Sequence, residues 1–232
     1  FLKQYPDSIV IDQSAIGKSS RANPATYTGI FDQIRKEFAS ATATDASMFS
    51  FNSKGACPKC NGQGVLSFEL HFLDAVKTTC DECEGKRYKS EVLQLKYRGK
   101  TIADVLDMSV DEAYRFFTSA KINKQLKVLQ DVGLGYLKIG QSLSSLSGGE
   151  SQRLKIASEL HKAGNIYVMD EPTTGLHMSD IHRLYSIIRS LVDKNNTVII
   201  IEHNLDIIKY ADWIIDMGPE GGKQGGEVIF QG

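Results

Sequence analysis

The chain has 232 residues, 41% of them hydrophobic and 24% charged, with a formal net charge of -1. This is the composition of a folded globular protein with one large or two small domains, and the balanced charge excludes a uniformly basic surface, so any nucleic-acid surface must be local. No apolar stretch approaches the ~20 residues of a membrane helix, and no signal peptide is visible. Because the chain begins with Phe1 rather than methionine, we expect it to belong to a longer protein.

The N-terminal stretch predicts a short strand at residues 8–11, followed by Asp12 and Gln13. A polar, turn-rich segment then contains Gly17-Lys18-Ser19, which superficially resembles a P-loop. A P-loop requires another glycine five positions before the Gly-Lys pair, and Asp12 stands there instead. We therefore predict no P-loop here, but a helix over residues 31–38 and a loop over 39–47.

Four cysteines form two Cys-x-x-Cys pairs, Cys57 with Cys60 and Cys80 with Cys83, separated by nineteen residues. This spacing is typical of zinc sites. Four thiolates close a tetrahedral shell and leave no open position, so a structural rather than a catalytic zinc ion is predicted. A redox motif would need only one pair, and four unrelated thiols would rarely have this spacing.

A strand is predicted over residues 65–73, between the two cysteine pairs, and another over 92–97, after the second pair. Lysines, arginines and aromatic residues are concentrated here, and this is the most basic part of the chain. Two interpretations stay open: a surface that contacts a phosphate backbone, or a solvated face whose charge is diluted by Asp81, Glu82, Glu84 and Glu91.

Ser109 and Glu112 have the spacing of a capping box that opens a helix, and a second helix is predicted over residues 123–131. Ser147 and Glu150 have the same spacing, and helical periodicity follows to residue 160. Between them, Gly148 and Gly149 let backbone amides approach an anion at the positive end of a helix. Ser-Gly-Gly alone more often marks an ordinary capped helix than an anion site.

Residues 166–169 are an unbroken apolar run, as expected for a parallel strand buried on both faces. The run ends in Asp170 and Glu171, where ligands of open α/β sheets bind. One carboxylate there can hold Mg²⁺, and the other can orient and deprotonate an attacking water. Further along the chain, we predict a helix over 179–194, a buried strand over 197–201 that leads to His203, a short helix over 206–210, and closing strands over 213–217 and 227–230.

The run of residues 146–153, Leu-Ser-Gly-Gly-Glu-Ser-Gln-Arg, resembles the signature motif of ABC-type ATPases, and the strand that ends in Asp170 and Glu171 resembles their Walker B motif. The resemblance implies the following roles: Asp170 binds Mg²⁺; Glu171 is the general base; Gln13 contacts Mg²⁺ and the attacking water; His203 contacts the γ-phosphate; residues 173–177 form the D-loop; and Ser147, Gly148, Gly149 and Glu150 close over ATP held by another domain.

A Cys₄ insert between the glutamine and the signature is unlike transporter ATPases and resembles the C-terminal half of the UvrA family, the damage-recognition ATPases of bacterial nucleotide excision repair. The matching stretches run along the whole chain: 12–14, 21–29, 49–52, 85–88, 170–177, 202–206 and 216–222. The resemblance implies an α/β ABC-type ATPase core, P-loop NTPase-like, over residues 1–16 and 146–232. An inserted helical signature domain would cover 17–145, with a zinc module over about 47–100.

The same resemblance implies ATP, Mg²⁺ and structural Zn²⁺ as cofactors. It implies double-stranded, damaged DNA, a second copy of the protein and a UvrB-like subunit as partners, with no membrane and a cytoplasmic location. No Walker A motif lies in these residues, so we expect this chain alone to hydrolyse no ATP. Residues 162–165 make a shorter connection than a housekeeping repair protein would have. This favours an alternative: a UvrA-like paralogue in drug self-resistance or another non-repair role. A third hypothesis is that the zinc module is an adaptor for protein partners.

Overall fold

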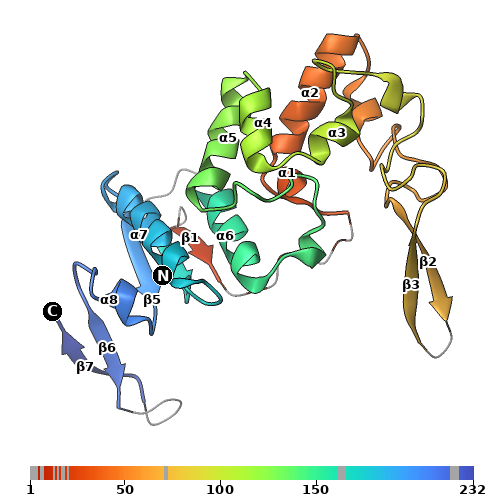
Figure 1. The fold of residues 1–232 in the computed structure, drawn as a ribbon. Coiled ribbons are helices and arrows are strands. Elements are labelled where there is room, and N and C mark those ends of the chain that lie inside the picture. The colour runs from red at the N-terminus through yellow and green to blue at the C-terminus, as the bar shows by residue number, and fades with distance from the viewer. Residues whose placement is uncertain are drawn as a thin grey trace. The chain divides into compact units, whose positions relative to one another are not determined.

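The computed structural model describes residues 5, 8–12, 14, 16, 19, 21–70, 73–160, 166–219 and 225–232. The chain divides into two compact units, Ser14–Ala163 and a discontinuous unit of Phe1–Gln13 with Gly164–Gly232 (Figure 1). Gln13, one of the predicted site residues, lies outside the described residues. In the part of the chain that is described, no helix combines the length and the apolar character that crossing a bilayer requires.

The unit Ser14–Ala163 is mainly helical. Its α-helices are α1 (Pro24–Tyr27), α2 (Ile30–Thr42), α3 (Ile102–Leu106), α4 (Val110–Phe116), α5 (Ala120–Asp131) and α6 (Gly148–Glu159), and its 3-10 helices are η1 (Ala46–Phe49), η2 (Val92–Gln94) and η3 (Leu143–Ser145). Reciprocal capping boxes open α1, α3, α4 and α6. The two boxes predicted from sequence, at Ser109 and Ser147, are therefore confirmed. The helix predicted over 31–38 continues to Thr42, into the segment that was expected to be a loop.

The core of this unit includes the apolar faces of α2 and α5, with Ile30, Ile34 and Phe38 buried on α2 and Ile122, Leu126 and Leu129 buried on α5. Phe38 joins the helices to the cysteine-bearing segment. Its ring centroid lies 5.2 Å from that of Phe49 and 5.4 Å from that of Tyr97. Such tilted aromatic pairs add packing energy beyond the area that they bury.

Strands β2 (Val65–Leu70) and β3 (Leu73–Thr79) form an antiparallel hairpin that extends from the cysteine-bearing loops (Figure 1). The single strand predicted over 65–73 therefore corresponds to β2 and to the first residue of β3. The strand predicted over 92–97 is wrong. There the amides of Val92 and Leu93 both donate to the Lys89 carbonyl, so the chain forms the 3-10 helix η2 instead of a strand. Of the three residues of η2, only Val92 is buried.

The second unit contains a parallel sheet in the order β1-β4-β5, formed by β1 (Ser8–Ile11), β4 (Ile166–Asp170) and β5 (Thr197–Ile201). Helix α7 (Met178–Val192) packs against β5, and the short α8 (Leu205–Ile208) follows it. The chain closes with the antiparallel pair β6 (Ile215–Gly218) and β7 (Glu227–Gln231).

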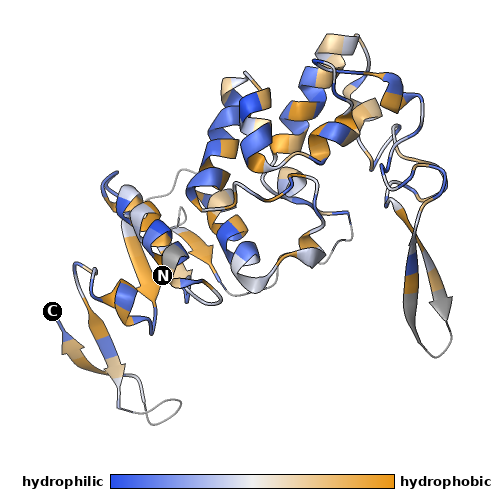
Figure 2. Cartoon of the chain, viewed as in Figure 1, coloured by the Kyte–Doolittle hydropathy of each residue, from blue (hydrophilic) through white to orange (hydrophobic). Residues whose placement is uncertain are grey.

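The prediction that β5 is a buried strand is wrong. Ile199 is 42% exposed and Ile201 52% exposed. The residues of β5 are apolar, as Figure 2 shows. An apolar sequence alone, however, does not determine whether other elements cover both faces of a strand. In β4, alternate residues such as Tyr167 and Met169 are buried and their neighbours are half-buried.

Candidate nucleotide and metal sites

The end of strand β4 turns sharply. Asp170 is the last residue of β4, and Glu171 follows with a positive φ of 42°. A left-handed conformation is unusual for a residue other than glycine and costs energy that the surroundings must offset. The Glu171 amide donates to the Ile201 carbonyl at 2.9 Å, and the Thr174 amide returns to the Glu171 carbonyl at 3.0 Å. The turn thus directs a carboxylate out of the strand at the carboxyl end of the sheet.

His203 lies against that carboxylate. Its Nε2 is 2.8 Å from Glu171 Oε1, although the two residues are 32 positions apart. The side chain of His203 is 78% exposed and that of Glu171 is 30% exposed. Parallel pairing of β4 with β5 places Asp170 opposite Ile201, so both residues leave the sheet at the same edge. The structure therefore brings together three predicted site residues, Asp170, Glu171 and His203, in one unit.

Sequence reasoning missed Glu202. Its carboxylate bonds to Thr173 in the turn after Glu171 and to the backbone of His203 and Asn204. The sequence did contain a signal for Glu202, because it is a carboxylate at the end of an apolar strand and directly precedes His203.

The predicted signature residues form the start of α6. Ser147 is the N-cap: its Oγ accepts from the Glu150 amide at 3.2 Å, and its own amide donates to Glu150 Oε2 at 2.8 Å. A Cβ added to Gly148 would meet nothing within 4 Å, so packing within the chain does not demand a glycine there. Open space at the positive end of a helix is suitable for an anion. Gly149, in contrast, is buried.

The other oxygen of Glu150 accepts a hydrogen bond of 2.7 Å from the Tyr136 hydroxyl, a contact that the sequence did not suggest. Partial burial opposes ionisation of Glu150, but the bonds from Tyr136 and Ser147 outweigh it and keep the pKa of this carboxyl below its ordinary value. Glu150 is therefore a capping carboxylate in this structure, held from both sides.

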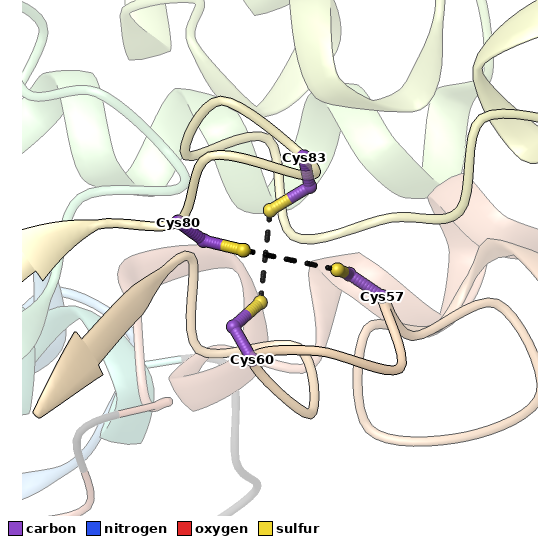
Figure 3. Close-up of side chains that lie close together, drawn as sticks. All are labelled: Cys57, Cys60, Cys80 and Cys83. Carbon is purple, nitrogen blue, oxygen red and sulfur yellow. Dashed lines mark hydrogen bonds between the residues drawn. The ribbon is translucent and has the colours of Figure 1, made fainter.

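The four predicted metal ligands converge (Figure 3). The sulfur atoms of Cys57, Cys60, Cys80 and Cys83 all lie within 4.8 Å of one another, and all four residues are buried. The Cys57–Cys80 and Cys60–Cys83 sulfur pairs are 4.0 Å and 3.6 Å apart. A tetrahedral ion with Zn–S bonds of about 2.3 Å separates its sulfur ligands by about 3.8 Å. The cluster is therefore compatible with a tetrahedral zinc ion.

The surrounding loops suit thiolate ligands. The Gly64 amide donates to Cys60 Sγ at 3.2 Å. Gly64 has a φ of 78°, and a Cβ there would lie 2.8 Å from the Gly85 carbonyl oxygen, so this close turn needs glycine. Burial raises the pKa of the Cys83 thiol to about 12, whereas bonds from the Cys83 backbone keep the pKa of Cys80 below its ordinary value.

The basic residues near the cysteines are partly neutralised. Lys59 pairs with Asp81 at 2.7 Å and Lys86 with Glu84 at 3.1 Å. Arg98 lies over the ring of Phe116. The two exposed ion pairs contribute little stability, but they reduce the positive potential that a phosphate backbone would meet.

Comparison with known proteins identifies the family. Residues 7–174 match the family model described as ABC transporter, which covers more than half of the chain. The chain belongs to the ABC transporter family. The resemblance to UvrA is also confirmed. The chain is 55% identical to UvrABC system protein A of Aquifex aeolicus and 49% identical to that of Escherichia coli strain K12, over 100% of its length in both cases.

A crystal structure of UvrA2 from Deinococcus radiodurans superimposes on this ABC-family chain with a TM-score of 0.90, at 47% identity over 100% of the chain. The match establishes an ABC ATPase fold of the UvrA type. The chain spans 26% of the length of the Aquifex and Escherichia proteins and 30% of the UvrA2 chain. The chain therefore corresponds to about a quarter of the length of these relatives.

Proposed function

We propose that this chain supplies parts of the ATPase machinery and a DNA-engaging zinc module to a UvrA-like nucleotide excision repair protein. The observation that carries the proposal is the 2.8 Å contact between His203 Nε2 and Glu171 Oε1 at the ends of adjacent parallel strands. A carboxylate and an imidazole held together at this edge can serve the water and the terminal phosphate of one nucleotide.

In this proposal Glu171 accepts the proton of the attacking water, and His203 contacts the γ-phosphate and holds Glu171 in place. Asp170 and Gln13 hold Mg²⁺, which neutralises charge on the phosphates when it is bound. Ser147, Gly148, Gly149 and Glu150 contribute to a second nucleotide site, where backbone amides at the start of α6 face the phosphates. The proposed domain division keeps residues 146–163 with the ATPase core.

The zinc module, residues 47–100, is proposed to help engage double-stranded DNA, damaged DNA above all. The partners proposed are a second copy of the protein and the other components of the UvrABC system named for its relatives, including a UvrB-like subunit, in the cytoplasm. Zinc would act structurally by fixing the loops from which β2 and β3 extend. Lys77 on the exposed part of β3 is a candidate for a phosphate contact.

Replacing Glu171 with glutamine in the complete protein tests the ATPase role. The amide cannot accept the proton from water, so kcat for ATP hydrolysis should fall by about 100-fold or more, while ATP binding is retained. Phosphate release and equilibrium nucleotide binding measure the two quantities. Glu227→Gln, the same change at an exposed position of β7, is the matched control. A Glu171→Gln variant with wild-type turnover would remove Glu171 from the base role.

A non-repair role is the second candidate, favoured by the short connection at residues 162–165 and by the ion pairs that neutralise part of the zinc module. Binding of the complete protein to lesion-bearing and intact duplex, each titrated with salt, distinguishes the two. Repair predicts a preference for the lesion and a steep salt dependence, whereas equal affinities with a flat salt slope favour the alternative.

A further inference from the structure

One carboxylate ties together the two loops that carry Glu171 and His203. Glu202 follows the last residue of β5. Its Oε1 accepts from the Thr173 amide at 2.9 Å and from the Thr173 hydroxyl. Its Oε2 accepts from the amides of His203 at 2.9 Å and Asn204 at 3.0 Å. Four donors, two on each oxygen, therefore converge on this half-buried side chain.

This arrangement suits a side chain that accepts hydrogen bonds on both of its terminal atoms. A deprotonated carboxyl group only accepts hydrogen bonds, whereas a carboxamide of the same shape has one accepting oxygen and one donating NH₂ group. Because both oxygens of Glu202 face donors, either orientation of an amide would set NH₂ against N–H or O–H groups. Bonds to a charged acceptor are also about twice as strong as neutral ones.

The loops held by Glu202 include the strained turn. Thr173 stands two residues after Glu171, whose φ of 42° must be enforced by its neighbours. On one side the Glu171 amide is held by the Ile201 carbonyl, and on the other Thr173 is held by Glu202. The same carboxylate fixes the backbone amide of His203, whose ring contacts Glu171.

We propose that Glu202 is a positioning residue of the ATPase site: its carboxylate holds the turn after Glu171 and the loop of His203 so that their side chains meet. In this proposal Glu202 acts through these two loops, and not on the nucleotide or the water itself. This inference rests on the proposed ATPase function, but the hydrogen-bond arrangement can be tested without it.

The kinetic test is Glu202→Gln in the complete protein. A displaced Glu171–His203 pair should lower kcat by about 10- to 100-fold, because misplacement of about 1 Å has effects of this size, while KM for ATP changes less than about 3-fold. Glu227→Gln is the matched control and should keep the wild-type kcat. The proposal would be overturned by an unchanged kcat, and equally by a loss of kcat/KM that comes entirely from a higher KM.

Thr173→Val provides a graded comparison. It removes the hydroxyl donor and keeps both the amide donor and the size of the side chain, so its loss of kcat should be smaller than that of Glu202→Gln. Thermal unfolding of each variant shows whether it folds. A Thr173→Val variant with the larger defect would contradict the assigned geometry, because it breaks one of the four bonds.

The structural test uses the 232-residue chain without nucleotide. In its ¹H–¹⁵N spectrum, Glu202→Gln should move the amide protons of Thr173, His203 and Asn204 upfield as they lose a charged acceptor, with distant amides unchanged. Suppose that the Glu171→Gln variant hydrolyses ATP normally while the three amides shift in the Glu202→Gln variant. The ATPase assignment then fails, and the hydrogen-bond geometry of Glu202 stands. If the three amides do not move, the inference on Glu202 fails whatever the kinetics show.

Discussion

Glu171 combines the chemical role proposed for it with an unfavourable backbone conformation. An L-residue in a left-handed conformation is less stable by roughly 1–2 kcal/mol than in a right-handed one, and glycine is the residue that normally occupies such a position. Here a glutamate occupies it at φ 42°, at the point where the chain leaves β4. The turn brings the carboxylate to 2.8 Å from the His203 imidazole. Local instability is thus tied to the geometry of the candidate site.

The prediction at this scale compares Glu171→Gly with Glu171→Ala. Both remove the carboxylate, but only glycine relieves the left-handed strain, partly offset by the greater entropy of glycine in the unfolded chain. The glycine variant should be the more stable by about 1 kcal/mol, as measured by urea unfolding of the chain, and both variants should lack turnover in the complete protein. Equal stabilities, or a more stable alanine variant, would show that the turn is not strained.

Among the elements, α2 is joined to the cysteine-bearing segment by aromatic packing. Phe38, from the last turns of α2, contacts both Phe49 of η1 and Tyr97. Tyr97 in turn stacks on Phe117 with centroids 6.0 Å apart. A zinc site orders only its own loops, so this cluster attaches the module to the helices of the same unit.

Phe38→Ala should therefore lower the free energy of unfolding by about 3–5 kcal/mol, because it leaves a cavity between rings in a buried cluster. Denaturant unfolding of the 232-residue chain measures the loss. Phe68→Ala is the matched control: Phe68 is 53% exposed on β2, so this variant should lie within about 0.5 kcal/mol of wild type. Similar losses in the two variants would contradict a core role for Phe38.

At the scale of the whole molecule, the chain has two compact units with separate sources of stability. The unit Ser14–Ala163 contains the four cysteines, whereas the other unit contains the parallel sheet and is assembled from both ends of the chain. A metal ion held by the four cysteines would therefore stabilise one unit only.

Removing zinc with a chelator should abolish hydrogen-exchange protection in residues 57–88 and spare residues 166–201, because zinc binding supplies about 10 kcal/mol or more in small zinc modules. Exchange followed by mass spectrometry, with and without added zinc, measures both regions. Acidification should have the same effect, since protons compete with the metal for the thiolates and affinity falls as pH falls. Equal loss of protection in both regions would contradict the division into units.

Sequence and tertiary structure determined different parts of this picture. Features set by short spacings followed from the sequence alone: the capping boxes at Ser109 and Ser147, the two Cys-x-x-Cys pairs, and the strand that ends in Asp170. These features depend on residues that are close in the sequence. A capping box joins residues three positions apart, and each Cys-x-x-Cys pair places two metal ligands within four consecutive residues.

Only the tertiary structure decided which side chains meet. The Glu171–His203, Glu202–Thr173 and Tyr136–Glu150 contacts join residues 32, 29 and 14 positions apart. The first two depend on the register of β4 and β5, which no single-strand pattern specifies. For the same reason the burial of β5 was mispredicted: an apolar run states what a strand prefers, but the elements packed against it decide which of its faces are covered.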